Sequence, residues 1–226
     1  MPLEFSEAVG SFASEVQALL DAVLPGKRIV RVEEQGQSFM VKTDPLWLPL
    51  TVKDEPLAEL RVWLACCADS SGDYLAVAES AFVLRSTLDR EPLVWLEYDR
   101  AARTAPASHW QVHAERGAFS HLLAHAKAKA PHDLSSLHLP VGGARYRPCI
   151  EDFLQFLVCE CGVDRHTNTW KNAVEAGRQQ WRMRQIRTLV RDAPTEAAHV
   201  LEKLGYRIDP PELDHGVLPA DLLCRW

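Results

Sequence analysis

Histidines and a glutamate form the pattern in this sequence that is best suited to chemistry. Nine histidines are present, and five of them lie within the middle of the chain. If residues 108–114 form a strand, alternation places His109 and His113 on one face. If the neighbouring run 93–99 is also a strand, Glu97 lies on one of its faces. Whether that is the face of His109 and His113 depends on the register between the two strands, which the sequence does not fix. Two imidazoles beside a carboxylate suit general acid–base catalysis, so we predict His109, His113 and Glu97 as catalytic. The alternative is a solvated polar face.

A second candidate group precedes residue 150. The run from Leu137 to Pro148 contains a glycine pair and two arginines that flank a tyrosine. Backbone amides freed by glycines, together with guanidinium groups, are typical of phosphate contacts. This pattern predicts His138, Arg145 and Arg147 as phosphate-binding residues. The alternative is a tight crossing loop without a ligand.

The third candidate is a basic stretch. Residues 165–191 contain seven Lys and Arg against one acid, Glu175, in a chain of net charge −6. Residues 1–115 carry −8 and residues 116–226 carry +2, which argues against a general nucleic-acid coat but permits one anion-binding face. We predict that Lys171, Arg178 and Arg182 contact a nucleic-acid strand. The alternative is a solvated helix.

A metal site is not predicted. His121 and His125 are one helical turn apart, which is the spacing of zinc-binding helices, but Leu122 occupies the position of the glutamate in the HExxH motif. Two exposed histidines explain this pair as well. The six cysteines form no CxxC pair, which favours a reduced, cytoplasmic protein. No cofactor is expected. No membrane segment is expected either, because no apolar run approaches the ~20 residues of a membrane-spanning helix.

These candidates are positioned by two kinds of elements. Residues 5–23 have helical periodicity, and six or seven strand-like runs follow between residues 27 and 114 with short turns and no intervening helix. Helical patterns return at 118–129, 150–161, 168–191 and 193–204. The fold class is therefore α+β, with an N-terminal helix, an antiparallel meander sheet and a helical C-terminal half. We expect residues 1–115 and 116–226 to form one integrated domain with a C-terminal helical appendage.

The long basic helix changes its apolar side part-way along. Trp170, Val174 and Trp181 cluster on one side of a helical wheel, whereas the later apolar residues lie nearly opposite. A continuous helix with this pattern packs against two different bodies. We therefore expect the C-terminal helices to contact a protein partner or a second copy of the chain. The later residues are Met183, Ile186 and Val190.

Part of the sequence resembles a known family. The strand with His109 and His113 is followed by the run Leu-His-Leu-Pro at 137–140 and by a helix that opens Ile-Glu-Asp-Phe-Leu at 150–154. Over about residues 93–157 this order resembles TumE-like toxins of bacterial toxin–antitoxin modules. Those proteins share a histidine-bearing sheet, an H-x-P-like loop and a helix that begins with Glu-Asp. The resemblance implies a toxin with an antitoxin partner.

Three functions follow from these patterns. The first is an RNA-acting toxin or defence effector, a metal-independent ribonuclease with histidine acid–base catalysis. The second is a non-enzymatic regulatory module that binds protein or nucleic acid. The third is a metal-dependent hydrolase. A nuclease assay with and without chelator separates the first from the second, and elemental analysis identifies the third.

Overall fold

The computed structural model describes residues 3–36, 38–69, 72–88, 90–114, 130, 132–133, 139–141 and 147–209. Within these ranges a helix comes first, a series of strands follows, and three helices end the chain, which confirms the predicted α+β class. The predicted helix at 118–129 lies outside the described residues. The helices are α1 (Leu3–Val23), α3 (Ile150–Cys159), α4 (Trp170–Asp192) and α5 (Pro194–Lys203).

The strands form one antiparallel sheet. Its order is β1-β2-β4-β5-β6-β7-β8, and β3 pairs separately with β4. Nearly every strand therefore pairs with the next one along the chain, which confirms the meander. The strands are β1 (Ile29–Gln35), β2 (Ser38–Asp44), β3 (Leu48–Val52), β4 (Glu55–Ala68), β5 (Leu75–Ser86), β6 (Pro92–Asp99), β7 (Ser108–Val112) and β8 (Leu139–Pro140).

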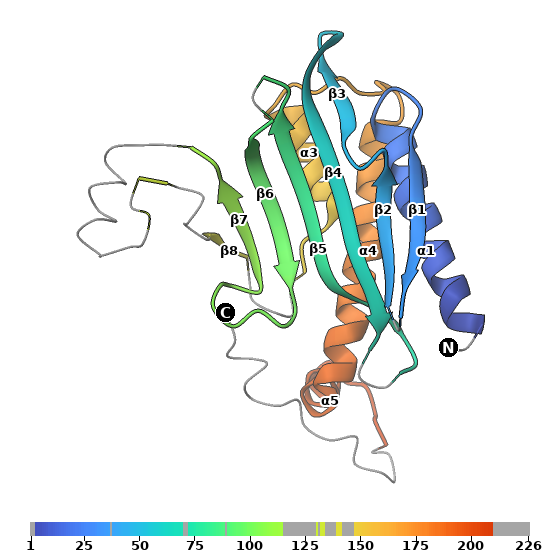
Figure 1. Cartoon of the computed structure of the whole chain (residues 1–226). Coiled ribbons are helices and arrows are strands. Elements are labelled where there is room, and N and C mark those ends of the chain that lie inside the picture. Colours follow the sequence, from blue (N-terminus) through green and yellow to red (C-terminus); the bar gives the residue numbers. More distant parts are fainter. Residues whose placement is uncertain are drawn as a thin grey trace.

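The sheet has one covered face and one open face. Helices α1, α3 and α4 all lie behind the sheet in Figure 1, and in the described part of the chain no helix covers the front. Apolar side chains between the sheet and these helices form the core, which removes apolar area from water and so stabilises the fold. The larger of them include Leu20, Leu60, Phe82, Leu96, Phe153 and Leu157.

Strand β4 shows how alternation decided between strand and helix. The apolar run 57–68 also fits a helical period, but every second residue from Ala58 to Cys66 is buried in the core. The residues between them, such as Arg61 and Trp63, lie on the open face and are half-buried. A period of two matches the pleat of a strand. Strand β5 shows no such alternation, because its residues from Ser80 to Leu84 are buried on both faces.

The two sequence halves share one core. Buried side chains of α1 and the sheet form a single cluster with those of α3 and with Val174 of α4, whereas α5 contributes no buried residue. Among the described cysteines none forms a disulfide. Within the described ranges, no helix combines the length and the apolar character needed to cross a membrane.

Candidate functional site

The pairing of β6 with β7 brings Glu97 and His109 together. The two residues are direct neighbours across the ladder, so both side chains lie on the open face. The Oε2 atom of Glu97 lies 3.5 Å from Nε2 of His109. The register that the sequence left open is therefore the one that the predicted catalytic pair requires.

A hydrogen bond through Nδ1 orients the ring of His109. Its Nδ1 lies 2.8 Å from the carbonyl oxygen of Pro106, and because a carbonyl only accepts hydrogen bonds, Nδ1 carries a hydrogen. Nε2 is then the basic nitrogen, and it faces Glu97. Burial lowers the pKa of His109, but the hydrogen bonds to Glu97 and Pro106 and the charge of Glu97 outweigh burial, so the pKa is raised. The residue is only 6% exposed.

His113 is separated from this pair. Its ring packs against Trp95, with 5.4 Å between ring centroids, and its buried Nε2 has no hydrogen-bond partner. Four residues of an extended strand place it about 13 Å from His109 along β7. Over that distance the two imidazoles do not share one scissile phosphate. The structure thus brings Glu97 to His109 but leaves His113 apart.

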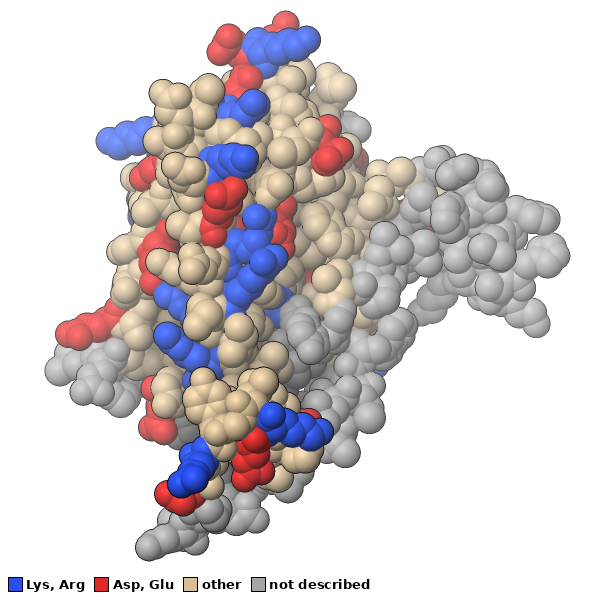
Figure 2. Space-filling model, turned by 180° about the vertical axis from the view of Figure 1, so that it is seen from behind, with Lys and Arg blue, Asp and Glu red and all other residues tan. Residues whose placement is uncertain are grey.

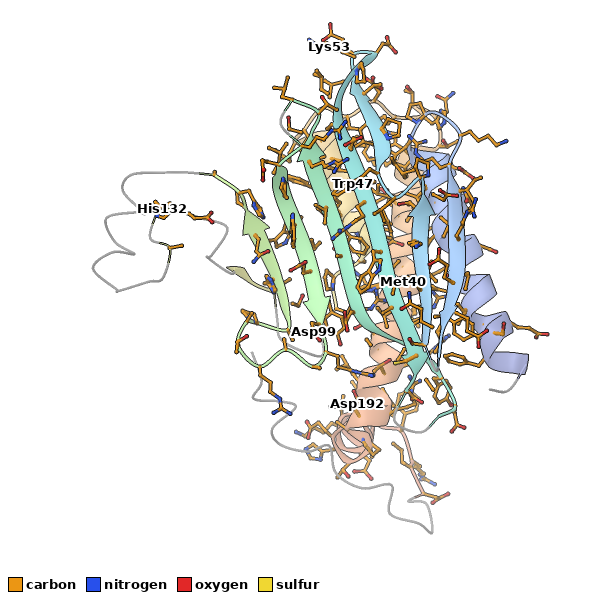
Figure 3. The ribbon with its side chains drawn as sticks, in the orientation of Figure 1. Met40, Trp47, Lys53, Asp99, His132 and Asp192 are labelled. Carbon is orange, nitrogen blue, oxygen red and sulfur yellow. The ribbon has the colours of Figure 1, made fainter. Side chains whose placement is uncertain are left out.

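The open face around these residues is filled by its own side chains. The guanidinium of Arg61 lies 5.4 Å from the Trp47 ring and 5.8 Å from the Trp95 ring, and Arg85 stacks 3.7 Å above Trp47. Figure 3 shows Trp47 in front of the sheet. Such cation–π contacts cover the strands beneath, and Val83 is 0% exposed although it points away from the helices. This layer leaves little room for a substrate.

Two of the basic residues of α4, Arg178 and Arg184, form ion pairs within the protein. Arg178 donates to Asp152 of α3 at 2.8 Å and to Gln155. Arg184 forms a bidentate pair with Glu15 of α1, with both N···O distances at 2.7 Å. Figure 2 shows blue side chains along α4 with red ones beside them. These pairs attach α4 to its neighbours and reduce the local positive charge that the sequence predicted for a nucleic acid.

The later half of α4 has the opposite character. Met183, Ile186 and Val190 are 46%, 51% and 48% exposed, which confirms that the apolar side changes within one continuous helix. No ion-pair partner among the described residues contacts Arg182 or Arg187, which are exposed on either side of this stripe. Lys171 is exposed too, at the beginning of the helix. Further exposed apolar residues follow in and after α5, namely Val200, Leu201, Leu204 and Tyr206.

No protein-family model, curated protein or solved structure matches the chain. The resemblance to TumE-like toxins is therefore neither confirmed nor contradicted.

His138 and Arg145 lie outside the described residues, as do His121 and His125. Elsewhere, the described residues contain no cluster of three or more His, Cys, Asp or Glu side chains that could hold a metal ion.

Arg147 lies at a cavity that the sequence did not predict. This cavity, about 280 Å³ in volume, lies on the covered side of the sheet between α1, α4 and the beginning of α3. Glu151, Gly177 and Trp181 also line it. The sequence offered one weak signal, which is a glycine inside a long helix, where glycine is disfavoured unless another group approaches closely.

Proposed function

We propose that the protein is a non-enzymatic regulatory module whose exposed end of α4 binds an acidic, apolar segment of a partner protein. The observation that carries this proposal is the exposure of Met183, Ile186 and Val190 on one side of a well-formed helix. Spacings of three and four residues place them in one stripe, as in helices that bind a partner through an apolar face. We name these three residues the apolar stripe.

Charge defines the chemistry of the partner. Arg182 and Arg187 flank the apolar stripe on opposite sides of the helical wheel, and within the described residues neither has an acidic partner. Opposite charges beside an apolar contact increase the association rate and fix the register of binding. An amphipathic helix with leucines on one side and glutamates along both edges matches this surface. The antitoxin implied by the resemblance to TumE-like toxins would be a partner of this kind.

The test measures binding of a defined peptide to the full chain. A fluorescent amphipathic peptide with Leu anchors and Glu edges is titrated and followed by anisotropy, beside the same peptide with Lys at every Glu position. We expect binding of the Glu peptide only, weakened by added salt because exposed charges are screened. Ile186→Ser should weaken it at least tenfold. Leu57→Ser, a matched change at an exposed leucine of β4, should have no effect.

Charge reversal tests the flanking arginines. Arg187→Glu should transfer the preference to the Lys peptide, whereas Lys27→Glu, at an exposed site before β1, should not. Equal binding of both peptides would overturn the proposed chemistry. If the wild type forms a concentration-dependent dimer and Ile186→Ser dissociates it, the apolar stripe binds a second copy of this chain rather than a different protein. If the wild type binds RNA and Arg182→Ala abolishes that binding, the ligand of this surface is a nucleic acid rather than a protein.

RNA cleavage stays a second prediction, because Glu97 and His109 do pair as that mechanism requires. General acid–base catalysis contributes about 10²–10⁴ in rate, so His109→Ala should remove nearly all cleavage of total RNA while the circular dichroism spectrum is unchanged. His113→Ala should change cleavage little, because His113 lies apart from the pair. His121→Ala should change little. Equal cleavage by wild type and His109→Ala would contradict the assignment, and loss in His121→Ala together with bound zinc would favour a metal-dependent hydrolase.

A further inference from the structure

The cavity beside Arg147 has an apolar body. Leu64 and Phe82 of the sheet form its floor, and Val16 and Leu19 of α1 form a wall. At ~30 Å³ per water molecule, its volume of about 280 Å³ corresponds to about nine water molecules. Glu15 and Arg184 also line the cavity, and their side chains are more exposed than those of Glu151 and Phe82. The two form an ion pair that joins α1 to α4.

Glu151 contributes a buried carboxylate. The residue is 7% exposed, and none of the described cations forms an ion pair with it. Its Oε1 lies so close to α4 that a Cβ atom on residue 177 would be 2.4 Å away, so the carboxylate requires glycine there. Burial raises the pKa of the Glu151 carboxyl, and the charge of Arg147 is among the effects that oppose this. A cationic partner would remove the cost of burying this group.

Two residues that line the cavity carry hydrogen-bond donors. Nε1 of Trp181 is buried and has no acceptor, which costs free energy unless a ligand or water accepts from it. Arg147 also lines the cavity, and none of the described acids forms an ion pair with it. Glu15 and Arg184 neutralise each other. The cavity is therefore lined by one positive group, Arg147, and one negative group, Glu151, and each charge shifts the pKa of the other. Trp181 adds a donor without an acceptor beside an apolar wall.

We propose that this cavity binds a free amino acid with an apolar side chain, such as leucine or phenylalanine. The ligand carboxylate accepts from the guanidinium of Arg147 and from Nε1 of Trp181, because a guanidinium and a carboxylate form strong paired hydrogen bonds. The ligand ammonium donates to Glu151. The side chain packs on Phe82 and Leu64. A zwitterion adds an opposite charge beside each of the two groups, whereas a fatty acid adds one only for Arg147 and an amine only for Glu151.

Matched ligands test the two charges separately. Isothermal titration calorimetry on the full chain compares L-leucine with 4-methylpentanoate, which lacks the ammonium, and with 3-methylbutylamine, which lacks the carboxylate. L-phenylalanine, 3-phenylpropanoate and phenethylamine form a second series. We expect one of the two amino acids to bind at least tenfold more tightly than both of its analogues. If all three members of each series bind equally, or no amino acid binds below about 10 mM, the proposal is wrong.

Variants locate the site. Trp181→Phe keeps the ring and removes the N–H, and it should weaken amino-acid binding about tenfold, as expected for a lost hydrogen bond to a charged group. Trp170→Phe, on the same helix but not among the residues that line the cavity, is the matched control and should bind as wild type does. Glu151→Gln should abolish the preference for leucine over 4-methylpentanoate. An unchanged preference in Glu151→Gln, or unchanged affinity in Trp181→Phe, would overturn the assignment whatever the ligand series shows.

Discussion

The open face of the sheet and the exposed end of α4 make an instructive comparison. The open face has the residues that chemistry requires, yet His109 bonds to Pro106 and faces Glu97, and Trp95 covers Val83 and His113. The end of α4 has ordinary aliphatic residues that contact little, such as Ile186. Reactive side chains can thus serve packing, while a stripe of Met, Ile and Val stays exposed. Exposure and pairing, rather than residue type, identify the free surface.

The largest contrast is expected from the same substitution in both regions. Val83→Ala should destabilise the protein by about 1.5–3 kcal/mol, because the substitution removes two methyl groups from a closely packed layer of side chains and creates a cavity there. Val190→Ala should be neutral or stabilise by up to about 0.5 kcal/mol, because alanine favours helix and little packing is lost. Urea unfolding of both variants measures the difference. Similar losses in the two would mean that the end of α4 is packed in solution.

A second prediction concerns the pH dependence of the open face. Because the pKa of folded His109 is raised, its contribution to stability is complete below the pKa of the unfolded chain and is lost as pH rises through the folded pKa. Wild type should therefore lose stability between pH 6 and pH 9 relative to His109→Gln. Chemical unfolding at a series of pH values tests this, with His199→Gln on exposed α5 as control. A variant with the same pH profile as wild type would show that the Glu97 contact contributes nothing.

The smallest effect is expected where α4 is attached to α1. A double-mutant cycle on Glu15 and Arg184 should give a coupling energy of about 0.2–1 kcal/mol, because both side chains are more than one-third exposed and water screens them. Added salt should reduce that coupling. The cycle consists of Glu15→Gln, Arg184→Gln and the double variant, measured by urea unfolding. Zero coupling at low salt would free Arg184 for an external anion and weaken the contrast between the two halves of α4.

The elements were largely predictable from sequence because their patterns are local. Alternation along β4 and the helical periods of α1 and α4 depend on residues a few positions apart, and Gln35-Gly36 marked the first hairpin turn, where Gly36 has a positive φ of 64°. The change of apolar side near Arg182 was predictable for the same reason. The choice between strand and helix stayed open at 57–68 and at 74–86, since short apolar runs fit both periods, and the structure shows strands at both.

The sequence by itself determined which elements form and which of their faces are apolar, because the periods of helices and strands depend on local geometry. Only the tertiary structure decided what the charged and polar groups do. Strand register placed Glu97 beside His109, and the approach of α4 to α3 paired Arg178 with Asp152. Residue 177 had to be glycine for Glu151 to lie against α4, although 26 residues separate the two in sequence. Contacts between distant residues depend on how whole elements pack, which no local pattern records.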